Sequence, residues 1–403
     1  MTKTVTIIGG GPAGLFCAYM LVKNGIQVEL FEATSGLCKK FLIAGSSGLN
    51  LTHSEELNKF SKRYGVNSQY FTSLLEDFSP KDLQDWCADL DVETFTGSSG
   101  RIFPTKMSAA SMLKNWKAQL DESHLFTLKT QHKFLKFITP NKLQFLKAGK
   151  DLVEIDTETT VFATGGSSWK STGSDGDWAN AFIEKGIKLI PFTPMNCGFE
   201  REWSQEFKKK IDSSPLKNVV IQAGNSSIRS EMMLTIYGVE GTGIYALSNH
   251  IRDAITNSGS TTISLDLRPD LTEEEILKRL NKPRGKNSLT NFLRKSLKVT
   301  NTESVLLREL LSKEDFQDIE KLSKAFKKLD IELLRTRPID EAISTSGGVS
   351  FEELDENLML KQYEGIYICG EMIDWDAPTG GYLLQGCFST AFRVAQSILN
   401  NKK

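Results

Sequence analysis

The strongest constraint in this sequence is a glycine-rich turn between an apolar strand and an apolar helix near the N-terminus. Residues 5–8 form a short, continuous apolar run, as in a strand buried on both faces, and residues 9–14 read Gly-Gly-Gly-Pro-Ala-Gly. Residues 15–22 are apolar at helical spacing, and residues 26–31 read as a second strand. This order of strand, glycine-rich turn, helix and strand predicts a β-α-β unit of Rossmann type. Its crossover should be right-handed, as almost all connections between parallel strands are.

The glycine spacing within this turn is typical of a pyrophosphate-binding site. Gly9 permits the tight turn, Gly11 lets the backbone approach the phosphates, and Gly14 lets the helix pack closely on the strand. The first helical residues, Pro12 and Ala13, stand where a helix N-terminus offers free N–H groups and positive partial charge. We therefore expect these five residues to bind the phosphates of a dinucleotide.

An acidic residue follows the second strand of the unit. Glu32 stands where a carboxylate can accept hydrogen bonds from both hydroxyls of a ribose, each worth ~1.5–3 kcal/mol when one partner is charged. The same negative charge disfavours a ribose 2′-phosphate. The unit therefore predicts FAD or NAD rather than NADP.

Two later strands also end in glycine. Thr164 and Gly165 follow an apolar strand, in a stretch where glycines allow a sharp turn past a ligand. A further apolar strand, residues 366–369, ends in Gly370 and Glu371. The order strand, glycine, acid resembles the second FAD-binding segment of two-segment flavoproteins, in which the acid binds the ribityl chain.

The last helix of the chain opens after a second pair of glycines. Gly380, Gly381 and Tyr382 precede or begin this helix, whose N-terminus would point at the flavin pyrimidine ring in a two-segment flavoprotein. A helix N-terminus favours negative charge, so it would favour the reduced flavin. The two segments together predict FAD as the cofactor.

These segments together resemble the BaiN-like (aminoacetone-oxidase-type) NAD(P)/FAD-dependent oxidoreductases over nearly the whole chain. The resemblance implies an FAD domain interrupted by a β-barrel-like and a helical subdomain, and it adds Lys40 and Asn50 to the expected cofactor-binding residues. The matching segments are residues 9–14, 39–43, 50–52, 100–104, 163–177, 346–349 and 370–382.

One segment departs from that family. Where the family usually has Gly-Gly-Gly-Arg-Cys-Asn, residues 45–50 read Gly-Ser-Ser-Gly-Leu-Asn. Gly48 and Leu49 therefore replace the arginine and the cysteine, and no role of those two residues transfers to this chain. We expect a divergent branch of the family.

The predicted fold class is α/β, with a discontinuous Rossmann-like domain. Residues 1–190 and 336–403 form the expected FAD-binding domain, residues 191–270 a β-rich, barrel-like insertion, and residues 271–335 a helical insertion. Within the first part, short strand-like runs between residues 124 and 166 predict a β-meander that begins with Phe126-Thr127-Leu128.

Several further residues admit two interpretations. Arg101 can hold an anionic substrate group or serve as a structural arginine bonded to carbonyls. His53 can donate a proton, although a surface-loop histidine is the commoner case. Trp375 and Tyr382 can contact the flavin or pack in the core. No residue stands out as the catalytic acid or base.

Composition limits the other possibilities. The 403 residues carry a formal net charge of −1, and the six cysteines form no CxxC pair, so we expect reduced thiols, no metal site and no global attraction to nucleic acid or membranes. No apolar run is long enough to cross a bilayer, and a cytoplasmic location is expected. Residues 278–298 contain eight Lys or Arg and no acid, which favours a solvated helical face over a nucleic-acid site.

The sequence therefore predicts an FAD-dependent oxidoreductase acting on a small-molecule substrate. Because there is no second GxGxxG after a strand, NAD(P)H is expected as a transient reductant at most. Two alternatives stay open. One is a dehydrogenase that uses NAD only, and the other is a flavin-bound RNA-binding or interaction protein without its own turnover.

Overall fold

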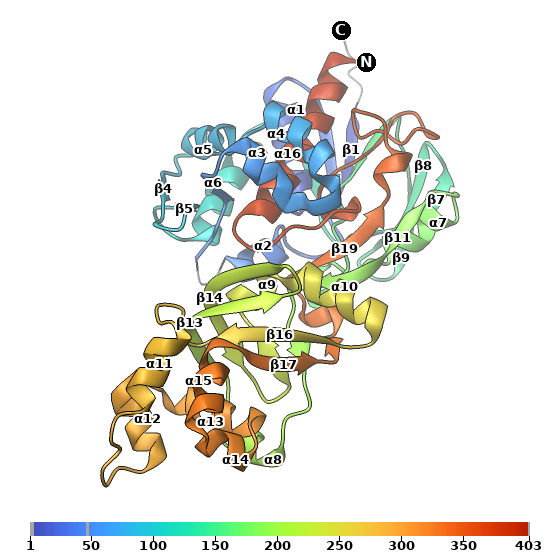
Figure 1. The fold of residues 1–403 in the computed structure, drawn as a ribbon. Coiled ribbons are helices and arrows are strands. Elements are labelled where there is room, and N and C mark those ends of the chain that lie inside the picture. Colours follow the sequence, from blue (N-terminus) through green and yellow to red (C-terminus); the bar gives the residue numbers. More distant parts are fainter. Residues whose placement is uncertain (1–3, 46–47, 402–403) are drawn as a thin grey trace. The chain divides into compact units, whose positions relative to one another are not determined.

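The computed structural model describes residues 4–45 and 48–401, and the chain forms two compact units (Figure 1). Unit 1 comprises Met1–Thr193 and Ile339–Lys403, and unit 2 comprises Pro194–Pro338. Ser46 and Ser47, in the segment that departs from the family pattern, lie outside the described residues.

A five-stranded parallel sheet forms the centre of unit 1. Its strands follow the order β20-β10-β1-β2-β6, and every neighbouring pair is parallel. The four residues of β1 are all buried, as expected for a strand covered on both faces. The predicted Rossmann-like α/β class is confirmed. The strands are β1 (Val5–Ile8), β2 (Val28–Phe31), β6 (Phe126–Lys129), β10 (Thr159–Phe162) and β20 (Ile366–Ile368).

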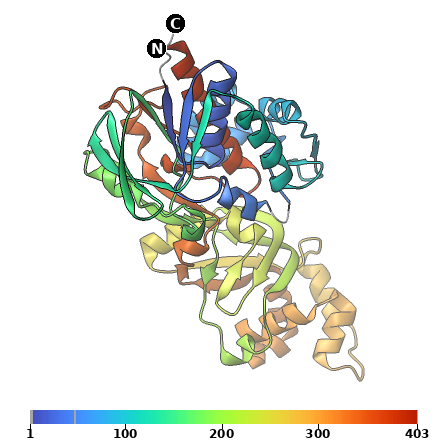
Figure 2. The same cartoon turned by 180° about the vertical axis from the view of Figure 1, so that it is seen from behind.

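The predicted β-meander starts one strand later than expected. Phe126–Lys129 pairs in parallel with β2 and extends the central sheet, whereas the antiparallel meander consists of the three following strands, β7 (His132–Thr139), β8 (Lys142–Lys147) and β9 (Asp151–Asp156) (Figure 2). The short apolar pattern of β6 fits either sheet, so its partner is set by the tertiary structure.

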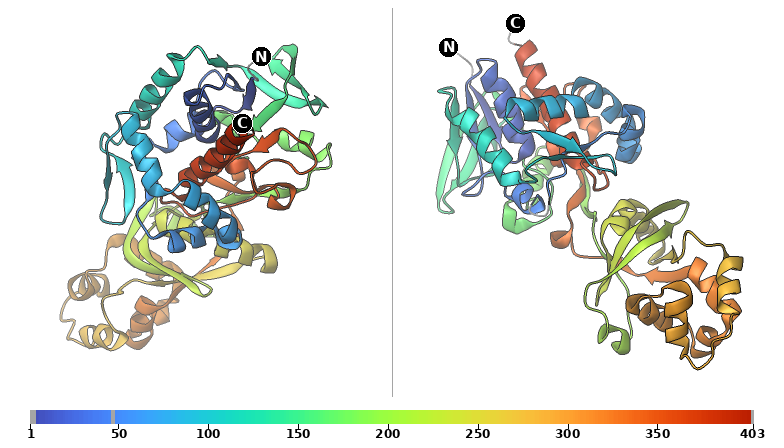
Figure 3. Two further views of the ribbon diagram at one scale, coloured as in Figure 1. Left: turned by 90° about the horizontal axis from the view of Figure 1, so that it is seen from above. Right: turned by 90° about the vertical axis from the view of Figure 1, so that its left-hand side faces the viewer.

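Helices cover the central sheet, and α16 (Tyr382–Asn400) lies beside α1 (Pro12–Lys23) and α4 (Ser68–Asp77) (Figure 3). The ring of Phe16 on α1 lies 5.0 Å from that of Phe78 and 5.2 Å from that of Phe388 on α16. The other helices of unit 1 are α2 (Lys39–Ala44), α3 (Leu57–Phe60), α5 (Pro80–Asp89), α6 (Ala109–Asp121) and α7 (Trp178–Ile183).

A small antiparallel sheet lies against the start of α16. Its order is β3-β5-β4, with β3 (Thr52–His53), β4 (Thr94–Thr96) and β5 (Arg101–Pro104). Gly381 adopts a φ of 94°, and a methyl group on its Cα would collide with the backbone of Thr52. Only glycine therefore lets α16 begin so close to β3. Two further strands of the chain, β11 (Leu189–Met195) and β19 (Ser344–Val349), pair with each other.

Unit 2 contains a seven-stranded sheet and a group of helices. The strand order is β17-β16-β13-β14-β15-β12-β18, with antiparallel pairing throughout. Burial alternates along β17, as expected for a sheet with one face in the core. The strands are β12 (Phe199–Glu200), β13 (Ser214–Ala223), β14 (Ser226–Leu234), β15 (Gly238–Glu240), β16 (Thr261–Asp266), β17 (Leu329–Leu333) and β18 (Arg335–Thr336).

The helices of unit 2 lie mainly between β16 and β17 in the sequence. Thr272 and Glu275 form a capping box at the start of α11. Unit 2 contains α8 (Gln205–Lys208), α9 (Thr242–Ala246), α10 (Ser248–Ser258), α11 (Glu273–Leu280), α12 (Leu289–Leu297), α13 (Asn301–Leu310), α14 (Lys313–Gln317) and α15 (Ile319–Lys327). Across residues 4–45 and 48–401, no helix has the length and apolar character needed to span a membrane.

Candidate functional site

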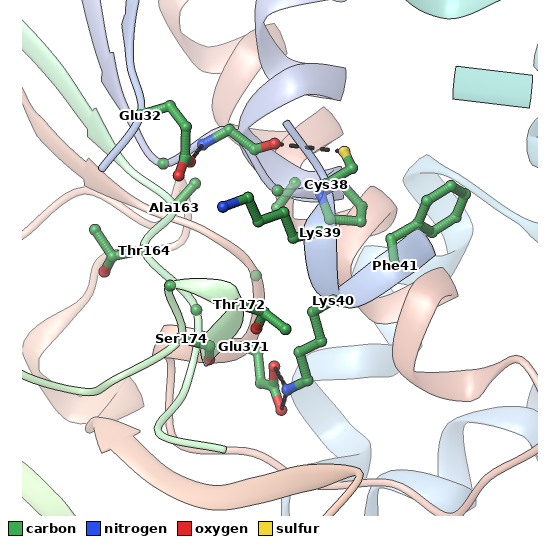
Figure 4. A pocket seen from close by; sticks show the side chains of 18 of the residues that line it. Glu32, Cys38, Lys39, Lys40, Phe41, Ala163, Thr164, Thr172, Ser174 and Glu371 are labelled. Atoms are coloured by element: carbon green, nitrogen blue, oxygen red, sulfur yellow. Dashed lines mark hydrogen bonds and ion pairs between the residues drawn. The ribbon is translucent and has the colours of Figure 1, made fainter. Parts of the chain in front are cut away.

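A groove in unit 1 gathers most of the residues that the sequence analysis singled out. It lies where β1 and β10 end and α1 begins, the usual ligand-binding edge of a parallel sheet (Figure 4). Its lining consists of Gly9, Gly10, Gly11, Pro12, Ala13, Glu32, Gly36, Cys38, Lys39, Lys40, Phe41, Ala163, Thr164, Gly165, Thr172, Gly173, Ser174, Gly370, Glu371 and Cys387.

The three motif glycines have three different surroundings. A methyl group on Gly9 would collide with the carbonyl oxygen of Ala163, and one on Gly14 would collide with the carbonyl oxygen of Gly9. A methyl group on Gly11 would meet no atom within 4 Å. Internal packing therefore explains Gly9 and Gly14, whereas the free space at Gly11 opens on the groove and is available to a ligand.

The carboxylate of Glu32 lies at the glycine-rich turn. Its Oε2 accepts a hydrogen bond from the Gly10 N–H at 2.8 Å, and its Oε1 accepts one from the Thr34 N–H at 2.7 Å. Each carboxylate oxygen has a second lone pair, so both can still accept a ribose hydroxyl. The side chain is held in place before any ligand arrives.

Lys40 and Glu371 come from opposite ends of the chain and form an ion pair beside the groove. The Lys40 Nζ lies 2.9 Å from Glu371 Oε2 and donates to Ser168 Oγ at 2.7 Å. Glu371 Oε1 also accepts from the Thr345 N–H at 3.1 Å. The structure thus brings these two predicted cofactor-binding residues together, and each orients the other.

Lys39 is a groove residue that the sequence analysis did not select. Its side chain extends into the groove, with the nitrogen turned away from the Lys40–Glu371 pair (Figure 4). Within the described part of the chain, its ammonium group has no hydrogen bond or ion pair. An unpaired cation beside a helix N-terminus suits an anionic ligand such as a pyrophosphate.

The groove lining also includes Cys38 and residues 172–174, which the sequence analysis did not select as single residues. The latter belong to the segment 163–177 that resembles the BaiN-like family, in which only Thr164 and Gly165 were selected. A methyl group on Gly173 would lie 2.7 Å from Thr34 Cγ2, so this loop packs closely beside the Glu32 turn. The glycines of this segment indicated a loop in the sequence, but nothing in the local sequence indicated that the loop packs against the turn after Glu32.

The two predicted cofactor segments meet at Gly370. A methyl group on this residue, whose φ is 77°, would lie 2.8 Å from Ala13 Cβ at the start of α1. Cys387 of α16 also lines the groove, and burial, with the nearby Glu371 charge, raises the pKa of its thiol to about 12. The thiol of this partly buried residue therefore stays protonated at neutral pH, as expected for an unreactive cysteine.

The predicted residues near the flavin ring lie outside this groove lining. Gly380 and Gly381 precede α16, and Asn50 precedes β3; the Asn50 Oδ1 is buried and has no partner among the described residues. The ring of Tyr382 packs against those of Phe60 at 4.7 Å and His53 at 5.5 Å. Trp375 is buried, and its indole N–H donates to the Gly370 carbonyl at 3.0 Å, so it packs in the core.

His53 uses both ring nitrogens within the fold. Its Nδ1 accepts a hydrogen bond from the Glu55 N–H at 3.1 Å, so the proton of the neutral ring lies on Nε2, which donates to the Ser99 carbonyl at 3.0 Å. This arrangement supports the structural interpretation of His53 over its use as a free proton donor.

The groove residues fit a flavin dinucleotide. The free space at Gly11, the uncapped start of α1 and the unpaired Lys39 are suited to phosphates, and Glu32 is suited to a ribose. The second segment, with Gly370 and Glu371, shares the same groove. A site for phosphates, ribose and a further polar chain is what FAD requires.

Comparisons with known proteins agree with this arrangement. The HI0933-like protein Rossmann domain matches residues 3–397. The chain is 25% identical to a 3-dehydro-bile acid delta(4,6)-reductase of Clostridium scindens, over 98% of both chains. It is 21% identical to a ribosomal RNA dihydrouridine synthase of Haemophilus influenzae, over 97% of both chains.

A solved structure shares the fold. A flavocytochrome c3 fumarate reductase in its open conformation superposes with a TM-score of 0.55 at 11% identity, covering 99% of this chain and 78% of that one. The family match extends over nearly the whole chain and confirms the resemblance found in the sequence. The chain belongs to the HI0933-like protein family with its Rossmann domain.

Proposed function

We propose that this chain, an FAD-dependent oxidoreductase, reduces a ring carbon–carbon double bond conjugated with a carbonyl group in a small-molecule substrate. The observation that carries the cofactor assignment is the convergence of the two glycine-bearing segments, since Gly370 packs against Ala13 and both line one groove. The alternative of a dehydrogenase that uses NAD only leaves Gly370 and Glu371 in this groove without a role.

The names of two relatives support the proposal that the reduced bond is a conjugated carbon–carbon double bond. One is a delta(4,6)-reductase of a 3-dehydro-bile acid, and another makes dihydrouridine, which is uridine with its ring double bond saturated. In both cases the double bond is conjugated with a carbonyl group. Saturation of such a bond adds one hydride and one proton.

The groove residues bind and orient the cofactor. Lys39 and the start of α1 hold the phosphates, Glu32 accepts the ribose hydroxyls, and Glu371, fixed by Lys40, accepts a hydroxyl of the ribityl chain. Bound FAD supplies hydride transfer, with NAD(P)H as the transient reductant. The cytoplasmic location expected from the sequence is part of this proposal.

An anaerobic turnover experiment tests the function. Purified protein is reduced with NADH or NADPH and mixed with cyclohex-2-en-1-one, a 3-keto-4-ene steroid or uridine. We expect at least one conjugated compound to restore the 450 nm flavin absorbance at a rate that rises with its concentration, and to yield a product heavier by two hydrogens. A flavin that stays reduced, with no saturated product from any of the three compounds, would contradict the proposal.

A second candidate function is reduction of uridine within RNA. The eight cations of residues 278–298 are all exposed, on the last turn of α11, on α12 and in the loops at their ends, and no acid interrupts them. An exposed cluster of this kind attracts phosphate backbones. The cations are Lys278, Arg279, Lys282, Arg284, Lys286, Arg294, Lys295 and Lys298.

Filter binding with a uridine-containing RNA hairpin tests this second candidate. If it is correct, replacing Lys278, Arg279, Arg294 and Lys295 with glutamine lowers affinity at least tenfold at low salt and makes it less salt-dependent. The matched control replaces residues 208–210, three exposed lysines of unit 2. Equal losses in the two variants, or no binding by the wild type, would remove this candidate and leave the small-molecule proposal.

A further inference from the structure

Arg101 has an unpaired guanidinium group. Unit 1 contains three arginines, of which Arg63 pairs with Glu55 and Arg393 pairs with Asp77. Arg101 is partly buried, and nowhere in residues 4–45 or 48–401 does it find a hydrogen-bond or ion-pair partner. A partly buried cation is normally paired because its desolvation is costly. The missing partner therefore points to a ligand.

The neighbouring polar groups are already satisfied. Glu55 accepts two hydrogen bonds from Arg63, at 3.0 and 2.9 Å, and one from the Tyr382 hydroxyl at 2.6 Å. Burial of Glu55 opposes ionisation, yet these hydrogen bonds hold the pKa of its carboxyl below the ordinary value. His53 lies directly opposite Arg101 in the β3–β5 pair, and both of its ring nitrogens form hydrogen bonds with backbone groups. These hydrogen bonds occupy Glu55 and His53, and neither of them pairs with Arg101 in the described part of the chain.

The position of Arg101 is fixed next to the start of α16. A methyl group on Gly380 would lie 3.8 Å from the Arg101 Nε. Gly380 and Gly381 both have positive φ, 134° and 94°, and Gly381 lies directly against Thr52 of β3. The guanidinium therefore lies beside the segment that the sequence analysis assigned to the flavin ring.

We infer that Arg101 is a substrate-binding residue, which holds the carbonyl or carboxylate oxygen of the substrate beside the start of α16. This inference rests on the proposed function. A planar guanidinium donates two parallel hydrogen bonds to a carboxylate, and its N–H groups can also donate to a single carbonyl oxygen. During reduction, the β-carbon accepts the hydride that bound, reduced FAD would supply, the electron pair of the double bond moves towards the carbonyl oxygen at Arg101, and the α-carbon then takes a proton from water. The product is the saturated carbonyl compound.

Isothermal titration calorimetry with the FAD-loaded protein tests the inference without turnover. The two probes are benzoate, which presents a carboxylate, and cyclohex-2-en-1-one, which presents a ketone. We expect Arg101→Met to weaken benzoate binding roughly 10- to 100-fold and ketone binding less, because the stronger hydrogen bonds join two charged groups. Arg101→Lys should retain part of the affinity. FAD content should stay unchanged in both variants.

The control is Arg229→Met in unit 2, whose exposed guanidinium already pairs with Asp270. Equal affinity of wild type and Arg101→Met for both probes would overturn the inference, as would a wild type that binds neither. If the Arg101→Met protein loses FAD, the Arg101→Lys protein is used for the test instead. The inference is overturned if Arg101→Lys binds both probes with wild-type affinity. Arg101-dependent binding without reduction of any conjugated compound would contradict the proposed function instead, so the two failures are distinguishable.

Discussion

Replacing Gly11 with valine is expected to weaken FAD binding at least 100-fold while the protein still folds. Gly11 has an ordinary φ of −77°, and a methyl group there meets no atom within 4 Å, so the backbone accepts a side chain. Because Gly11 is the N-cap of α1, the loss of folding stability should be ~1 kcal/mol or less. The side chain instead fills the space that the pyrophosphate needs.

Gly14→Val is the matched comparison for this prediction. Its side chain would collide with the Gly9 carbonyl oxygen inside the fold, and overpacking of this kind costs about 1–3 kcal/mol or more. FAD titration of the apoproteins, together with urea unfolding, separates the two effects. A Gly11→Val protein that binds FAD as the wild type does would show that the phosphates lie elsewhere.

Replacing Glu32 with alanine is expected to weaken FAD binding at least tenfold. The variant loses the hydrogen bonds to the ribose hydroxyls, each worth ~1.5–3 kcal/mol with a charged acceptor. It also frees the Gly10 and Thr34 N–H groups that Glu32 now holds, so the glycine-rich turn becomes less ordered. Glu32→Gln, which keeps one acceptor oxygen, should lie between wild type and alanine.

Glu29→Ala controls for the loss of a carboxylate from the same strand. Glu29 pairs with Lys129 at 2.9 Å on the sheet and does not line the groove. We expect near-normal flavin content for this variant, and its surface ion pair should contribute less than ~1 kcal/mol to stability. Normal flavin occupancy in purified Glu32→Ala would contradict the assigned role of Glu32.

The sequence predicted the parts of the fold in which local pattern and chemistry agree. The β-α-β unit is one such part, because the glycine spacing, the buried strand before it and Glu32 after the second strand are all typical of the same backbone arrangement. The observed β1, α1 and β2 have this arrangement. The strand at Phe126–Lys129 was assigned to the wrong sheet because a four-residue strand with only two apolar residues, Phe126 and Leu128, does not specify its partner.

The candidate site was predictable only where its residues lie in motifs. Lys39 and Lys40 are adjacent in the sequence, yet only the three-dimensional structure shows that Lys40 is paired with Glu371, 331 positions away, and that Lys39 has no hydrogen bond or ion pair among the described residues. The two interpretations of Arg101 were likewise undecided, because the sequence does not reveal which backbone carbonyls reach an arginine. Long-range pairing of charges depends on tertiary structure.

The central claim is that one FAD lies along the groove between the glycine-rich turn and Glu371. Calorimetric titration of the apoprotein with FAD tests it most directly. We predict one FAD per chain for the wild type and no measurable binding for Gly11→Val under the same conditions. A folded wild-type apoprotein that takes up no FAD, or one that binds FAD equally well with Gly11→Val, would contradict the claim.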